Sequence, residues 1–233
     1  MAIKKHIPNC ITLLNLFCGI VAILLAVNGM LGRSAFMIFL AAVFDFLDGL
    51  AARALHVKSD IGKELDSLSD IVSFGVAPAF IMYQMLALSS DYTTQVWGIQ
   101  IIPFVASALY PCCAALRLAK FNLDTTQTEM FHGLPVPAAA FVILSLQFYN
   151  VGAYAASIYT AIIILLCIAM LSRFPLLSLK FKNLTIKENI FRYALIGISL
   201  ILIICLKIRA ILFIMMTYFI LSIIYNIVYH KEK

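Results

Sequence analysis

Residues 45–70 read DFLDGLAARALHVKSDIGKELDSLSD, and this stretch lies in a chain that is otherwise overwhelmingly apolar. Asp45 and Asp48 are three residues apart, and Asp66 and Asp70 are four residues apart. If both pairs lie on helices, each pair projects from one helix face, because its members are about 60° and about 40° apart around the axis. Two helices that cross here would bring four carboxylates together.

A cluster of four carboxylates inside a membrane needs compensation. Each intramembrane carboxylate costs roughly 2.5–3.5 kcal/mol on insertion scales. Divalent cations would offset this cost, and hard oxygen ligands of this kind suit Mg²⁺ or Mn²⁺, which often bridge to substrate phosphates. The spacing therefore predicts a metal site, and the residues leave the choice among Mg²⁺, Mn²⁺ and Ca²⁺ open.

The composition of the 233-residue chain excludes an ordinary soluble domain. Hydrophobic residues make up 64% of the chain and charged residues 12%, and the mean hydropathy is +1.02. Because apolar runs of about 20 residues span a bilayer, we predict an all-α, polytopic integral membrane helix bundle. The net charge of +6 then indicates which loops face the cytosol rather than a nucleic-acid partner.

The apolar pattern predicts about eight transmembrane helices with a six-helix catalytic core, in a single membrane-embedded domain over residues 1–233. An amphipathic lead-in, Met1–Asn9, should lie at the membrane surface. The last two spans are accessory, and their junction around Lys207 and Arg209 is compatible with one broken helix. Residues 132–137 read as the loop that enters the fifth span. The spans are expected at residues 10–28, 34–55, 66–88, 96–118, 135–150, 154–171, 191–206 and 209–229.

Basic residues predict the orientation of the chain in the membrane. With the N-terminus inside, 14 of the 17 Lys and Arg residues fall on one side, and only Arg33, Lys207 and Arg209 fall opposite. This asymmetry predicts cytosolic termini and a cytosolic catalytic face, in what we expect to be a bacterial plasma membrane. The 14 residues are Lys4, Lys5, Arg53, Lys58, Lys63, Arg117, Lys120, Arg173, Lys180, Lys182, Lys187, Arg192, Lys231 and Lys233.

Three further features are read as structural. The apolar run Ile11–Val27 lacks a small-residue cleavage site, so we expect a retained span rather than a signal peptide. The four histidines are dispersed, which argues against a zinc site. The six cysteines form no CxxC pair and are expected to be small buried hydrophobes. They are Cys10, Cys18, Cys112, Cys113, Cys167 and Cys205.

Eight positions within residues 45–70 resemble the whole signature of the CDP-alcohol phosphatidyltransferase family. These positions, all filled at the family's spacing, are Asp45, Asp48, Gly49, Ala52, Arg53, Gly62, Asp66 and Asp70. The flanking segments look like the phosphatidylserine synthase branch of that family, and the resemblance covers roughly residues 3–140. Those segments are Ile7–Asn9, Asn15–Gly19, Glu64–Leu68, Val72–Pro78 and Leu116–Asn122.

The resemblance implies a reaction in which a phosphatidyl group passes from CDP-diacylglycerol to the hydroxyl of L-serine, with release of CMP. By the same resemblance Asp45, Asp48 and Asp66 match metal ligands, and Asp70 is close enough to share in coordination. Asp70 also matches the proposed general base. We expect two Mg²⁺ or Mn²⁺ ions, which would neutralise charge on the phosphorus under attack and on the departing CMP.

Four further signature residues are expected to bind CDP-diacylglycerol. They are Gly49, Ala52, Arg53 and Gly62. Gly49 permits close approach of the nucleotide, and Arg53 offers a positive fork to phosphate. Asp45 precedes Arg53 by eight residues, about 12 Å along a helix, so the site should lie just inside the cytosolic edge of the bilayer.

The acceptor site has four candidate residues, Arg117, Lys120, Asn122 and Ser73. Serine is a zwitterion, so its site should need both a cation and a hydrogen-bond acceptor. Arg117 and Lys120 could instead be ordinary positive-inside anchors. Ser73 could form hydrogen bonds between helices, as could three other polar residues near the site. Those three are Asn9, Thr12 and Asn15.

Several alternatives stay open from the sequence alone. A sister enzyme would use glycerol 3-phosphate or inositol phosphate as acceptor. An intramembrane prenyltransferase would need a second aspartate motif, and beyond Asp70 the chain offers only the unpaired Asp91 and Asp124. A cation transporter predicts charges at the membrane midplane, whereas these acids crowd one face. A homodimer is also left open.

Overall fold

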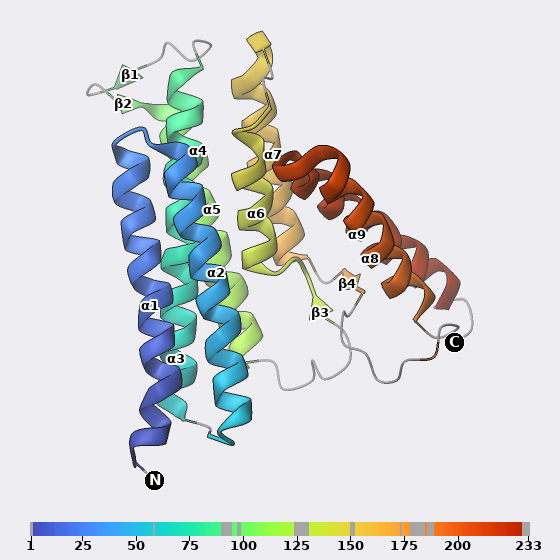
Figure 1. The fold of residues 1–233 in the computed structure, drawn as a ribbon. Coiled ribbons are helices and arrows are strands. Elements are labelled where there is room, and N and C mark those ends of the chain that lie inside the picture. The colour runs from blue at the N-terminus through green and yellow to red at the C-terminus, as the bar shows by residue number, and fades with distance from the viewer. Residues whose placement is uncertain are drawn as a thin grey trace.

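The computed structural model is an all-helical bundle (Figure 1). It describes residues 2–57, 59–89, 95–96, 99–123, 131–149, 152–172, 174–177, 185 and 189–229. The helices are α1 (Ala2–Val27), α2 (Leu31–Ala54), α3 (Asp60–Asp70), the π-helical η1 (Ile71–Val76), α4 (Ala77–Leu88), α5 (Ile101–Leu123), α6 (Val136–Leu146), α7 (Ala155–Leu171), α8 (Ile190–Leu206) and α9 (Ala210–Tyr229). Short 3₁₀ turns are η2 (Gly152–Tyr154) and η3 (Lys207–Arg209). Two antiparallel pairs of two-residue strands, β1 (Gln95–Val96) with β2 (Ile99–Gln100) and β3 (Phe131–His132) with β4 (Pro175–Leu176), lie between helices.

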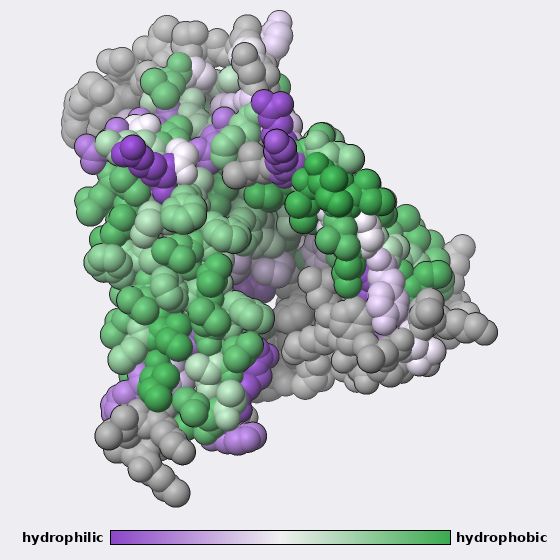
Figure 2. Space-filling view, viewed as in Figure 1, coloured by the Kyte–Doolittle hydropathy of each residue, from purple (hydrophilic) through white to green (hydrophobic). Residues whose placement is uncertain are grey.

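The helices have the length and composition of membrane spans, which confirms the predicted polytopic bundle. Within the described residues, five helical segments are long and apolar enough to cross a bilayer, and three shorter apolar helices accompany them. The five are His6–Val27, Leu31–Ala54, Asp60–Leu88, Ile101–Leu123 and Ala210–Val228. Figure 2 shows apolar side chains over the middle of the bundle and hydrophilic ones toward its ends.

Several predicted boundaries are wrong, among them the ends of α5 at Leu123 and of α6 at Leu146, and three others have a local reason. The lead-in over residues 1–9 is not a separate element, because α1 runs on continuously from Ala2 through Pro8. The third helix begins at Asp60 rather than at residue 66, because Ser59 caps it by accepting a hydrogen bond from the Gly62 N–H at 3.0 Å. The fourth begins at Ile101 rather than at residue 96, where a short β-hairpin stands instead.

The C-terminal pair is two helices rather than one broken helix. Lys207 has φ 51° and ends α8, and η3 connects α8 to α9. The two helices lie side by side (Figure 1), and α9 packs against α6. In the fifth-span loop, Gly133 has φ 74°, and α6 begins directly after Pro135, as predicted.

Other predictions meet the structure only in part. Cys18, Cys113 and Cys167 are buried, but the other three cysteines lie on the exposed surface of their helices, so the expectation of burial is wrong for them.

The start of α1, the end of α2, the start of α3 and the end of α5 share one end of the bundle (Figure 1). Lys58, Asp91, Asp124, Arg173, Lys180, Lys182, Lys187, Lys231 and Lys233 lie outside the described residues, as do the side chains of Lys4 and Lys5.

Helix α1 packs tightly against η1, and this contact fixes the third membrane segment. Ser73 Oγ donates to the Asn15 carbonyl at 3.0 Å, and Ser69 Oγ donates to the Thr12 carbonyl at 3.2 Å. A Cβ at Gly19 would collide with Ser73 Oγ and lie 2.9 Å from Ser73 Cα. The helices therefore approach this closely only because residue 19 has no side chain.

Gly19→Ala should destabilise the protein. The added methyl group must push α1 away from η1, and overpacking of this kind costs about 1–3 kcal/mol. For a chain of this size that cost lowers Tm by about 2–4 °C per kcal/mol, measurable by thermal unfolding in detergent. Gly32→Ala is the matched control, because nothing lies within 4 Å of a Cβ at that helical glycine. An unchanged Tm for Gly19→Ala would contradict the close packing.

Candidate active site

Three carboxylates meet where α2 and α3 face each other. Asp45 and Asp48 come from α2 and Asp66 from α3, and each offers one oxygen that lies within 4.8 Å of the others. Asp48 is buried, and the other two are partly buried. The spacing in the sequence had predicted this meeting, since residues three apart project from one face of α2.

Asp70 joins the same group from the last turn of α3. Its carboxyl contacts that of Asp45, and its Oδ1 accepts a hydrogen bond from Asn15 Nδ2 at 3.4 Å. Asp70 is buried, and the wide π-helical turn η1 begins directly after it. Turns of this kind occur frequently at functional sites. The structure therefore brings all four predicted aspartates together.

The residues of this cluster fit a divalent metal ion. Asp48 Oδ2 is buried and has no hydrogen-bond partner among the described residues. Ionised carboxylates this close repel one another, more strongly in low-dielectric surroundings than in water. A cation of charge two would both satisfy the buried oxygen and relieve the repulsion. The all-oxygen donor set suits a hard cation such as Mg²⁺ or Mn²⁺.

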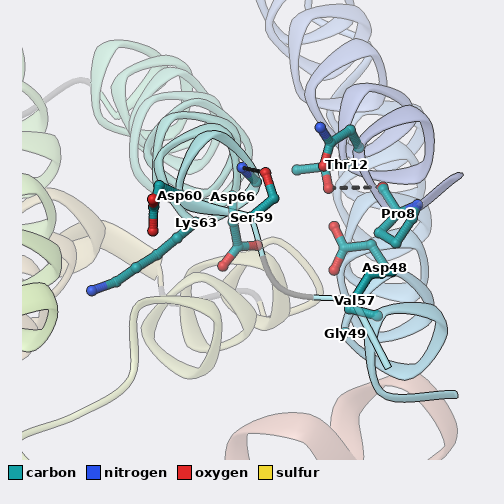
Figure 3. A pocket seen from close by; sticks show the side chains of 12 residues that line it. Pro8, Thr12, Asp48, Gly49, Val57, Ser59, Asp60, Lys63 and Asp66 are labelled. Atoms are coloured by element: carbon teal, nitrogen blue, oxygen red, sulfur yellow. Dashed lines mark hydrogen bonds between the residues drawn. The ribbon is translucent and has the colours of Figure 1, made fainter. Parts of the chain in front are cut away.

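A cavity of about 380 Å³ opens beside the carboxylates (Figure 3). Asp48 and Asp66 reach into it from different helices, and nothing lies within 4 Å of a Cβ built at Gly49. A ligand in the cavity would therefore touch the cluster directly. The lining residues are Pro8, Asn9, Thr12, Asp48, Gly49, Ala52, Val57, Ser59, Asp60, Gly62, Lys63 and Asp66.

Of the predicted donor-binding residues, some line the cavity and one does not. Gly49, Ala52 and Gly62 line the cavity, as a donor site requires. Arg53 is exposed and stands outside the lining. Lys63 also borders the cavity, but its side chain extends away from Asp48 and Asp66 (Figure 3), and its Nζ donates to the Asn122 carbonyl at 3.1 Å.

The four acceptor candidates differ in burial and in their hydrogen-bond partners. Arg117 is buried, its charge interacts with that of Asp70, and its guanidinium carbon lies 4.9 Å from the centre of the Phe121 ring. Lys120 is exposed. Asn122 Nδ2 donates to Ser67 Oγ at 2.8 Å, and the Ser73 hydroxyl bonds to α1, so both take part in the bonds between helices that the sequence reading left open. Arg117 is the best-placed acceptor candidate.

Together these features define a polytopic membrane protein with a cluster of carboxylates, suited to a divalent cation, beside a cavity at one end of its helix bundle. The chain belongs to the CDP-alcohol phosphatidyltransferase family, whose pattern it matches over residues 5–172. This confirms the resemblance noted in the sequence and makes the protein a phospholipid-synthesising transferase of the membrane. The match spans α1 to α7 and ends before α8 and α9.

Curated relatives from bacteria and archaea cover most of the chain. A CDP-diacylglycerol–serine O-phosphatidyltransferase of Bacillus subtilis is 37% identical over 147 residues, which are 63% of this chain and 78% of the relative. An archaetidylserine synthase of Methanothermobacter thermautotrophicus is 37% identical over 169 residues, 71% of this chain and 67% of the relative. A CDP-diacylglycerol–serine O-phosphatidyltransferase of Helicobacter pylori is 30% identical over 203 residues, which are 83% of this chain and 80% of the relative.

Proposed function

We propose that this protein transfers the phosphatidyl group of CDP-diacylglycerol to the hydroxyl of L-serine, giving phosphatidylserine and CMP. The observation that carries the proposal is the cluster of Asp45, Asp48 and Asp66 on the edge of a cavity at one end of the membrane bundle. The names of the relatives support serine as the acceptor. A lipid substrate can keep its tails in the bilayer there while its charged diphosphate reaches the protein.

Each group of residues has a distinct part in this reaction. Asp45, Asp48 and Asp66 would hold the divalent cation, Mg²⁺ or Mn²⁺, which when bound would offset negative charge on the diphosphate. Gly49 and Gly62 line the cavity and leave room for the nucleotide. Holding the donor in a fixed orientation lowers the barrier by removing rotational freedom before the reaction.

The acceptor side is built around Asp70. The serine oxygen forms a bond to the phosphatidyl phosphorus, the bond from phosphorus to the CMP oxygen breaks, and the serine hydroxyl proton passes to the Asp70 carboxylate. Arg117, whose charge interacts with that of Asp70, pairs with the serine carboxylate. Asn122 and Ser73 then hold helices together rather than touch serine, and the exposed Lys120 has no part in binding it.

The same proposal covers the domain and its orientation. Residues 1–233 form one membrane-embedded domain, with a catalytic core of six helical segments from α1 to α7, in which α3, η1 and α4 count as one segment, and an accessory hairpin of α8 and α9. Both termini and the active site face the cytosol of a bacterial plasma membrane. The end of the match with the family at residue 172 supports this division between core and hairpin.

An acceptor panel tests this function. Purified protein in vesicles with CDP-diacylglycerol and Mn²⁺ or Mg²⁺ should release CMP and form phosphatidylserine when L-serine is supplied. Glycerol 3-phosphate and inositol phosphate should give less than about a hundredth of that rate, because a site built to hydrogen-bond one substrate rejects others strongly. Turnover with either phosphate but not with L-serine would assign the protein to a sister activity.

A further inference from the structure

Asn15 on α1 lies next to Asp70 but has no role in the reaction described above. Its side chain is fully buried, and its Nδ2 donates to Asp70 Oδ1 at 3.4 Å. Its backbone carbonyl accepts the Ser73 hydroxyl, which fixes this turn of α1 against η1. The side-chain oxygen, Oδ1, is buried without a hydrogen-bond partner among the described residues.

The orientation of this carboxamide is set by Asp70. If the group were flipped, Oδ1 would face a carboxylate oxygen, and two acceptors would oppose each other. With Asp70 ionised, as the base of the proposed reaction requires, the N–H side faces Asp70 and Oδ1 is left over. A buried acceptor without a donor is unfavourable and calls for an explanation, and beside a reactive group a bound ligand that donates to it is one such explanation.

The chemistry around Oδ1 indicates which ligand group completes it. An amide oxygen accepts hydrogen bonds and cannot donate, so the ligand must bring a donor. In the proposed reaction the reactant that reaches Asp70 is the acceptor alcohol. Arg117, whose charge interacts with that of Asp70, offers a cation to the carboxylate of the acceptor. A zwitterionic acceptor then has one group left, its ammonium, which carries only donors.

We propose that Asn15 Oδ1 receives the ammonium group of the acceptor and thereby selects an amino-alcohol acid over acceptors that lack an amine. This inference rests on the proposed function, because it assigns the half of the serine site that Arg117 does not supply. Asn15 from α1, Asp70 from α3 and Arg117 from α5 then hold the ammonium, hydroxyl and carboxylate of one small molecule. If Asn15 merely joined two helices, it would affect all acceptors alike.

The test compares two acceptors within one protein. L-serine and 3-hydroxypropionate share a hydroxyl and a carboxylate, and only serine has an amine. Wild-type protein should prefer serine in kcat/KM by about 100-fold or more, as expected of a site that pairs a polar group. Asn15→Ala should reduce that preference at least about tenfold, through a higher KM for serine with an unchanged KM for CDP-diacylglycerol. Asn15→Ala also loses the hydrogen bond to Asp70. That loss lowers kcat/KM for serine and for 3-hydroxypropionate alike, so it cancels in the ratio of the two values.

Ser69→Ala is the matched control, because it removes a bond between α1 and α3 without touching Asp70, and it should keep the wild-type preference. If Asn15→Ala fails to insert into the membrane, Asn15→Ser takes its place, and it should reduce the preference for serine over 3-hydroxypropionate in the same way. A preference that stays within twofold of wild type in both Asn15 variants overturns the inference while leaving the proposed function intact. Wild-type protein that turns over other acceptors but not serine overturns the proposed function itself, and the inference with it.

Discussion

Asp45→Asn is expected to lower turnover of CDP-diacylglycerol at least about 10³-fold while the protein still inserts into the membrane. Asp45 lies in the three-carboxylate cluster and also contacts Asp70, so it joins the metal-binding and acceptor sides of the site. Asparagine keeps the shape of the side chain but removes the charge that would hold a cation. A bound metal supplies several kcal/mol of transition-state stabilisation, and each 1.36 kcal/mol is about tenfold in rate. The measurement is CMP release from vesicles containing the purified variant.

Glu64→Gln provides the control for this loss of charge. Glu64 is exposed on α3, two positions before Asp66, and stands outside the cavity lining. The substitution removes one negative charge by the same chemistry, so activity should stay within about twofold of wild type, as is usual for surface changes. Asp66→Asn should match Asp45→Asn. If Asp45→Asn kept more than a tenth of wild-type activity, the assignment of Asp45 as a metal ligand would be withdrawn.

Removal of divalent metal is expected to lower the turnover rate at least about 100-fold, and added Mg²⁺ or Mn²⁺ should restore the rate. Without a cation, the carboxylates and the diphosphate of the substrate repel each other at short range. The measurement is CMP release before chelation with EDTA, after it, and after metal is returned in excess.

EDTA saturated with Mg²⁺ beforehand is the control, because it carries the same chelator without removing metal. It should leave the rate unchanged. Full activity in an excess of metal-free EDTA would show that the aspartates act without a cation. The reaction would then need another explanation for how four buried or half-buried acids tolerate one another.

The sequence could predict which carboxylates share a helix face, because this follows from their spacing along the helix. Residues three and four apart share a helix face, so Asp45 with Asp48 and Asp66 with Asp70 had to project together once their helices were recognised. The five segments that are long enough to span a membrane, among the described residues, followed from the same logic, because a bilayer fixes how long an apolar run must be. The family signature then placed the two helices against each other.

Contacts between distant segments could not be predicted in this way. Asn15 and Asp70 are 55 positions apart, and their meeting depends on how α1 rotates about its axis. That rotation is set by the close approach of Gly19 to Ser73, which hydrophobicity does not reveal. The start of α5 was misplaced because a short apolar strand and a helix look alike in composition.

The most direct test of the account is Mn²⁺ binding to the purified protein, followed by the electron paramagnetic resonance signal of free Mn²⁺. Wild-type protein and Glu64→Gln should bind Mn²⁺ saturably, and CDP-diacylglycerol should tighten the binding. Asp45→Asn and Asp66→Asn should bind at least about tenfold more weakly, because each has lost one oxygen anion of the cluster. Equal affinity for Mn²⁺ in wild type and both aspartate variants would contradict a metal centre held by these carboxylates.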